Sequence, residues 1–191
     1  MPDIDLLFPS TIYKVEDLIS DNYKNELVDE CYRLKSNIPD QSYKWNCEIY
    51  TTYGDDLQNQ NKFSLLIKHI TDQVHAFACN LGCSARYNID GAWINISSAG
   101  NWQEHHNHPN SIFSAVYYLK APGNSGDLVF ENPRGYANNL KDVKEPNFYT
   151  MDQVNYPPKE NGLIIFRSYM QHMVKINKST KDRISVAINY S

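Results

Sequence analysis

From residue 87 onward, apolar and polar residues alternate with a period of two, the pattern of half-buried β-strands. Turn-rich pieces such as APGNSG and YPPKENG separate the alternating segments. A series of short antiparallel strands buries its apolar faces as a barrel or a jelly roll. The predicted strands are YNIDGAWINIS (87–97), SIFSAVYYL (111–119), GDLVF (126–130), GLIIF (162–166) and RISVAINYS (183–191).

The first part of the chain has helical periodicity instead. Residues 15–36 and 62–81 place apolar residues at helical spacing, and Gly82 ends the second helical pattern. Helices followed by many short strands predict a mainly β fold with N-terminal helices, in which two or more helices brace the barrel. The polar stretches 132–146 and 152–161 are expected to be loops that cover the barrel mouth.

Length and composition limit the class of protein. At 191 residues the chain fits a single domain, 1–191, with 1–86 as mainly helical support and 87–191 as the β core. A formal net charge of −4 argues against nucleic-acid binding, and no apolar run approaches the ~20 residues of a membrane span. The four cysteines are expected to be reduced thiols, and the protein to be cytoplasmic. Exposed strand edges would allow a homodimer.

Three of the six histidines lie in the stretch NWQEHHNHPN (101–110). If this stretch is a strand, His106 and His108 point to one face and His105 points to the other. Two imidazoles on one face can bind an iron, zinc or nickel ion, although histidines at a polar strand end are often without a role. His172, after the predicted strand GLIIF, supplies a further candidate ligand.

A positively charged residue begins the alternating strand RISVAINYS. Arg183 and Ser185 share one face of this strand, while Ile184, Val186 and Ile188 lie on the other. A guanidinium that points into a barrel needs an anionic partner, because an unpaired charge in a desolvated site is very unfavourable. The partner is either a bound carboxylate, held bidentately with help from a hydroxyl, or an internal Asp or Glu.

The order of motifs in the second half of the chain resembles a known superfamily. G-x5-H-x-H, SAVYYL, SGDLVF and GLIIF…H…RIS are similar to the 2-oxoglutarate/Fe(II)-dependent dioxygenases. More narrowly, they resemble the small 2OG-Fe(II) oxygenases with an H-x-H-P motif from bacteria and phages. The likeness covers residues 90–191 strongly, and LFPSTIY with its helices more weakly. It implies a double-stranded β-helix, that is a jelly-roll or cupin-like barrel, whose mouth holds iron through two histidines and one carboxylate.

The resemblance also implies roles for individual residues. His106 matches the first metal ligand and His172 matches the distal histidine. Arg183, helped by Ser185, matches the residue that binds the far carboxylate of 2-oxoglutarate, and Tyr118 resembles a tyrosine that hydrogen-bonds this carboxylate in prolyl hydroxylases. Further candidates are Ser114, Asn95 and Ser97 at the cosubstrate and Arg134 at the substrate rim.

One position departs from the pattern of the superfamily. Most members have an aspartate two residues after the first histidine, where this chain has His108. A neutral imidazole in place of a carboxylate leaves an Fe(II) site one charge unit more positive, which alters its redox behaviour. Three-histidine iron sites do occur in related cupin barrels. His108 is favoured as the third ligand because it is close to His106 in the sequence and strand alternation places both on one face. Asp127 or Glu131 from GDLVFE is the alternative.

Three classes of function follow from these residues. The leading one is an enzyme that uses Fe(II), 2-oxoglutarate and O2 to hydroxylate a peptidyl residue or a small metabolite, with release of succinate and CO2. The second is a three-histidine cupin-type metal oxygenase or hydrolase that does not use 2-oxoglutarate. The third is a noncatalytic barrel that binds a metal or a ligand. The trio Arg183, Ser185 and Tyr118 favours the first, because a cosubstrate carboxylate would give it a function.

Overall fold

Two antiparallel sheets make up the β part of the protein. The structure is a computed structural model that describes residues 5–44, 47–55, 57–135, 141–147 and 149–191. A six-stranded sheet has the order β1-β8-β5-β10-β3-β2, and a four-stranded sheet has the order β4-β9-β6-β7. The strands are β1 (Ile12–Val15), β2 (Tyr50–Thr51), β3 (Ile89–Ser97), β4 (Gln103–His106), β5 (Phe113–Lys120), β6 (Leu128–Glu131), β7 (Gln153–Tyr156), β8 (Leu163–Arg167), β9 (His172–Val174) and β10 (Arg183–Tyr190).

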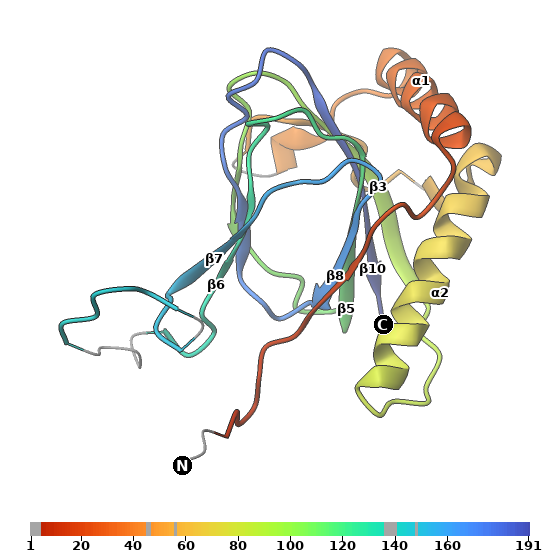
Figure 1. Ribbon diagram of the computed structural model, residues 1–191. Coiled ribbons are helices and arrows are strands. Elements are labelled where there is room, and N and C mark those ends of the chain that lie inside the picture. The colour runs from red at the N-terminus through yellow and green to blue at the C-terminus, as the bar shows by residue number, and fades with distance from the viewer. Residues whose placement is uncertain (1–4, 45–46, 56, 136–140, 148) are drawn as a thin grey trace.

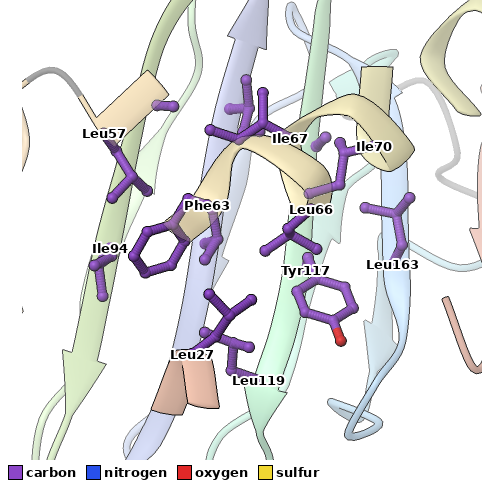
Figure 2. Packing of buried hydrophobic residues seen from close by; sticks show 14 of the residues in the cluster. Leu27, Leu57, Phe63, Leu66, Ile67, Ile70, Ile94, Tyr117, Leu119 and Leu163 are labelled. Carbon is purple, nitrogen blue, oxygen red and sulfur yellow. The ribbon is translucent and has the colours of Figure 1, made fainter. Parts of the chain in front are cut away.

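Two helices lie against one side of the larger sheet, α1 (Asp21–Asn37) and α2 (Ser64–Asn80) (Figure 1). Figure 2 shows Leu27 of α1 and Leu66 of α2 packed with Phe63 against Ile94 and Leu119 of the sheet. Three 3₁₀ helices connect these elements, at Ser42–Lys44, Leu57–Asn59 and Asn61–Phe63. The predicted architecture, a jelly roll braced by N-terminal helices, is therefore confirmed. Neither helix in the described part of the chain is long and apolar enough to cross a membrane.

The start of the first helix differs from the prediction. Residues Ile12–Val15 form β1, which pairs with β8, and α1 begins only at Asp21. The Oγ of Ser20 accepts a hydrogen bond from the backbone N–H of Tyr23 at 3.4 Å. This N-cap fixes where the helix starts, and a helical pattern extended back to residue 15 misses it. The second predicted helix, 62–81, agrees with α2.

The two faces of β10 bury different cores. Ile184, Val186 and Ile188 belong to the cluster that also holds the helix side chains. Arg183 and Ser185 therefore face the opposite way, toward the smaller sheet, because side chains alternate along a strand. The interior between the two sheets is filled by a second cluster, made of Tyr118, Leu128, Phe130, Ile164, Phe166 and Met170.

All five predicted strands are present, with ends that differ by one or two residues. The expected loop 152–161 is partly wrong, because Gln153–Tyr156 form β7 and pair with β6 along its whole length. Of the other expected loop, 132–146, residues 136–140 lie outside the described residues. The division into helical support (1–86) and β core (87–191) within one domain stays a prediction.

Candidate metal centre and cosubstrate site

Three histidines from two distant segments meet between the sheets. His106 ends β4 and lies directly opposite His172 of β9 in the strand register. His108 lies two residues beyond the strand, where its backbone N–H donates to the carbonyl of Ser168 at 3.0 Å. One potential ligand atom from each of the three lies within 4.8 Å of the other two. The expected convergence is present, although His108 reaches it from a loop and not from a strand.

Hydrogen bonds orient two of the three rings. Nδ1 of His106 is 2.8 Å from the carbonyl oxygen of Glu104, and Nδ1 of His172 is 2.9 Å from that of Met170. A carbonyl oxygen can only accept, so each Nδ1 carries the proton and each Nε2 carries the lone pair. Metal-binding histidines are commonly held in this way by a carbonyl on the second nitrogen.

Burial keeps the three rings uncharged. Desolvation lowers the pKa of His106 and lowers that of His172 well below its usual value. It also lowers the pKa of His108 to about 4, and the neighbouring His106 adds to this effect. Three neutral imidazoles within one small space are a donor set suited to Fe, Zn, Ni or Cu. The donor chemistry therefore fits an iron ion.

The two alternative carboxylate ligands lie elsewhere. Oε1 of Glu131 is 3.2 Å from Nε2 of His105, and both of these side chains are partly exposed. Asp127 lines a cavity with Met173 and Lys178, and none of the three histidines lines that cavity. Within the described part of the chain, the only group of three potential metal-binding side chains is the histidine cluster. The choice of His108 as third ligand is still a prediction.

Arg183 is buried, and none of the acidic residues that the structure describes pairs with it. The residue is 3% exposed, and Nη1 donates to the carbonyl oxygens of Gly126 at 3.0 Å and Ser125 at 3.3 Å. No carboxylate pairs with it among the residues that the structure describes, so the internal salt bridge is absent there. Desolvation lowers the pKa of this guanidinium. A buried cation held only by carbonyl dipoles is unfavourable unless an anion binds beside it.

Other buried polar atoms near Arg183 also have no hydrogen-bond partner among the described residues. They are Nε of Arg183 itself, Oγ of Ser97 and Ser125, and Oδ1 of Asn95. Ser97 lies opposite Arg183 in the strand register, and Ser125 contributes one of the carbonyls that the guanidinium contacts. Buried polar groups of this kind are rarely left unsatisfied. A ligand with a carboxylate would satisfy both hydroxyls and Nε, so these residues fit 2-oxoglutarate.

The remaining candidates divide into two groups. Ser185 lies opposite both Asn95 and Tyr118, next to Arg183 along the inner face. Burial raises the pKa of Tyr118 to about 12, and the guanidinium of Arg183 acts against that increase, so this phenol stays protonated and can donate. Ser114 lies farther along β5, where its Oγ is 2.8 Å from Ser168 Oγ and 2.8 Å from Asn189 Oδ1. It is therefore part of an internal network and does not lie beside the arginine.

Arg134 interacts with the N-terminal segment. Its Nη2 donates to the carbonyl oxygens of Leu7 at 2.6 Å and Phe8 at 2.9 Å. These residues line a groove of about 590 Å³ that also includes Phe130 and Met170. The role of Arg134 at a substrate rim stays a prediction.

Sequence reasoning missed three contacts at the site. The ring centroids of Phe166 and His172 are 4.8 Å apart, and those of Trp93 and His108 are 6.0 Å apart. The backbone carbonyl of Ser125 accepts a hydrogen bond from Arg183. Alternation marked Phe166 and Trp93 as strand residues, but only pairing across the sheets shows what they touch. Ser125 lies in a turn, and the sequence does not indicate which residue of that turn contacts the arginine.

The comparisons with known proteins agree with this geometry. The family described as "Putative 2OG-Fe(II) oxygenase" matches residues 91–189. The chain belongs to this family. The matched range contains all three histidines and Arg183 of this 2OG-Fe(II) oxygenase. No match was found among curated protein sequences.

Solved structures with a similar fold include two prolyl hydroxylases and a protein with bound 2-oxoglutarate. A Pseudomonas putida prolyl-4-hydroxylase aligns with a TM-score of 0.67 at 14% identity, over 95% of this chain and 92% of its own. A viral collagen prolyl hydroxylase from Paramecium Bursaria Chlorella virus-1, in complex with 2OG, aligns with a TM-score of 0.62 at 16% identity, over 94% of each chain. HygX from Streptomyces hygroscopicus, with nickel and 2-oxoglutarate bound, aligns with a TM-score of 0.67 at 10% identity, over 95% of this chain and 83% of its own.

Proposed function

We propose that this oxygenase hydroxylates a C–H bond of its substrate, with His106, His108 and His172 holding Fe(II) and Arg183 holding 2-oxoglutarate. When bound, Fe(II) and 2-oxoglutarate supply the chemistry that activates O2 toward a C–H bond. One oxygen atom of O2 enters the substrate C–H bond, the other enters succinate, and a carboxyl group of 2-oxoglutarate leaves as CO2. The main support for the proposal is that one interior holds three neutral imidazoles and the buried guanidinium of Arg183, which has no acidic partner among the described residues.

The protein's own contribution is orientation and exclusion of water. The carbonyls of Glu104 and Met170 keep two imidazoles in the ligating tautomer. Arg183, with the hydroxyls of Ser97 and Ser125, binds the far carboxylate and so fixes the position of the cosubstrate. The apolar side chains of Leu128, Val116 and Val174 pack in the interior cluster and keep the reacting volume dry.

The same proposal includes a cellular setting. The four cysteines are unpaired thiols, as expected in a reducing compartment, which supports a cytoplasmic enzyme. A net charge of −4 supports small-molecule or peptide partners over nucleic acid. Homodimer formation through strand edges stays part of the proposal.

Calorimetric titration of 2-oxoglutarate into the Mn(II)-loaded protein tests the proposal, together with succinate release by the Fe(II)-loaded protein in air. Replacing Arg183 with Leu should weaken 2-oxoglutarate binding roughly 30-fold or more, because it removes the partner of a buried carboxylate. Affinity for Mn(II) should not change. Arg86→Leu, at an exposed arginine, is the matched control and should bind 2-oxoglutarate normally.

Two results would contradict the proposal. Metal binding without any 2-oxoglutarate binding would favour a cupin-type three-histidine enzyme. Unchanged 2-oxoglutarate affinity in Arg183→Leu would show that the cosubstrate is held by other residues. In either case the arginine would need another anion.

A further inference from the structure

A further cavity lies beside the metal centre, and the proposed function has so far given it no role. It has a volume of about 590 Å³, within the range of small-molecule sites, and His108 is one of its lining residues. The rest of its lining comes from residues 53–55 and 58, the start of β3, the loop after β4 and Asn189 near the end of β10. We call it the His108 cavity.

The His108 cavity lies away from the arginine. Arg183 and Asn189 occupy the two ends of the same inward face of β10, and six residues of strand span roughly 20 Å. Trp93, another lining residue, lies opposite Ala187, between these two ends, and its ring contacts His108. A cosubstrate that extends from the histidines toward Arg183 therefore leaves this cavity open for the substrate.

The wall of the His108 cavity next to the metal centre is aromatic. The ring centroids of Tyr53 and Trp93 are 5.1 Å apart at an interplanar angle of 84°, and the centroids of Trp93 and His108 are 6.0 Å apart at 61°. These three rings form a continuous row that ends at the candidate metal ligand. Aromatic surfaces attract organic cations through the negative face of the ring.

The charged lining residues of the His108 cavity are acidic. They are Asp55 and Asp90, and none of the described lining residues is a lysine or an arginine. The carboxylate of Asp90 accepts hydrogen bonds from the hydroxyls of Ser111, at 2.7 Å, and Ser191. These donors are neutral, so they orient the carboxylate without cancelling its charge. Asp55 is exposed and has no ion pair in the described part of the chain.

We propose that the His108 cavity selects a substrate with an alkylammonium group, which lies against the Tyr53–Trp93 wall and near the carboxylates of Asp55 and Asp90. This deepens the proposed function and rests on it, because it names the substrate class of the same site. Fe(II) carries a charge of +2 and 2-oxoglutarate a charge of −2, so the metal and its cosubstrate together have no net charge. The two carboxylates would then set the sign of the potential in the cavity.

The test uses two probes that differ by one ammonium group. Nα-acetyl-lysine N-methylamide carries the cation, and Nα-acetyl-norleucine N-methylamide lacks it. Each is titrated into protein loaded with Mn(II) and 2-oxoglutarate, and paramagnetic broadening of the probe's NMR lines reports binding near the metal. The lysine probe should bind roughly tenfold more tightly than the norleucine probe, since two partly screened charges and an aromatic wall each contribute a few-fold.

Neutral variants decide which residues are responsible. Asp55→Asn/Asp90→Asn should remove most of the preference for the lysine probe, and Asp55→Asn alone, at an exposed position, should remove about half of it in free-energy terms. Asp29, an exposed aspartate on α1, does not line the cavity. Asp29→Asn also removes one negative charge and should keep the preference for the lysine probe. Equal binding of the two probes, or an unchanged preference in the double variant, would overturn the proposal.

The failure of the substrate proposal can be told apart from that of the proposed function. Calorimetric binding of 2-oxoglutarate is measured on the same samples. If 2-oxoglutarate binds and the lysine probe shows no preference, the cation proposal fails alone. If 2-oxoglutarate does not bind, the proposed function fails, and the same comparison with Mn(II) alone still decides whether the cavity selects cations.

Discussion

His108 is the residue on which the identity of the metal centre depends. Its ring reaches the other two from a loop, and its pKa of about 4 keeps it neutral. We predict that His108→Ala lowers Mn(II) affinity by more than about 100-fold, because second-shell changes alone cost 10–100-fold and this removes a ligand. Calorimetric titration with Mn(II) measures the effect.

Two matched substitutions complete the His108 experiment. His105→Ala removes a neighbouring imidazole that pairs with Glu131 and does not join the cluster, so Mn(II) affinity should stay the same. Asp127→Ala should also leave the affinity unchanged. A large loss in Asp127→Ala with none in His108→Ala would show that a carboxylate is the third ligand.

At the level of residues, the sequence predicted the convergence of the three histidines, because metal-binding chemistry is tied to residue type and spacing. The H-x-H pair, His172 and Arg183 stand out by residue type and by alternation, and the structure brings the histidines together. Ser114 is bonded to Ser168 and Asn189, away from Arg183 along the strand, and its grouping with the cosubstrate residues stays a prediction. Alternation gives the face of a strand and says nothing of the position along it.

At the level of elements, the turn before β6 positions a carbonyl for the arginine. Gly126 has φ +92°, a region that residues with a side chain rarely adopt, and a Cβ there would lie 2.1 Å from the carbonyl oxygen of Lys175. We predict that Gly126→Ala destabilises the protein by about 2–4 kcal/mol in urea unfolding, because the backbone must move. The movement should also weaken 2-oxoglutarate binding, since Gly126 O accepts from Arg183.

Gly123 provides the control for this turn. It has no atom within 4 Å of an added Cβ and does not need a positive φ. Gly123→Ala should therefore change unfolding free energy by less than about 1 kcal/mol and leave cosubstrate binding intact. Equal stability of the two variants would show that the close approach to Lys175 carries no structural cost.

The elements that the sequence failed to predict are those whose existence depends on a partner. β1 and β7 are short edge strands; β1 pairs with β8 from a distant part of the sequence, and β7 pairs with β6, which precedes it across a long connection. Each is only four residues long, so the alternation in QVNY of β7 and the apolar residues in IYKV of β1 are too short to identify a strand from the sequence. Helix α2 and β10, in contrast, bury a full face and were predictable from periodicity alone.

At the level of the whole molecule, one buried carboxylate between the helical segments contributes to acid sensitivity. Glu30 of α1 is bonded by Arg33 at 2.5 Å and by Lys62 of the third 3₁₀ helix at 2.8 Å. Arg33 contributes most to lowering the pKa of Glu30 to about 2, while burial acts against it. The folded pKa is below the unfolded one, so the stabilisation is complete above about pH 4.5 and is lost as pH falls toward 2.

Glu30→Gln should therefore remove part of the acid sensitivity of folding. At pH 7 the variant should lose up to about 3 kcal/mol of unfolding free energy, and the difference from the wild type should shrink between pH 4.5 and 2. Urea unfolding at several pH values measures this. Glu26→Gln, exposed on the same helix, is the control, and a pH-independent difference for Glu30→Gln would contradict the assignment.

The position of β10 has a consequence for how the protein is made. This strand lies between β3 and β5 in the larger sheet, carries the arginine at one end, and comes after all the other strands in the sequence. A nascent chain still on the ribosome therefore presents the edges of β3 and β5 unpaired until β10 has left the exit tunnel. The larger sheet therefore cannot close before β10 is available, and chaperones that shield open strand edges should associate with chains arrested before Arg183.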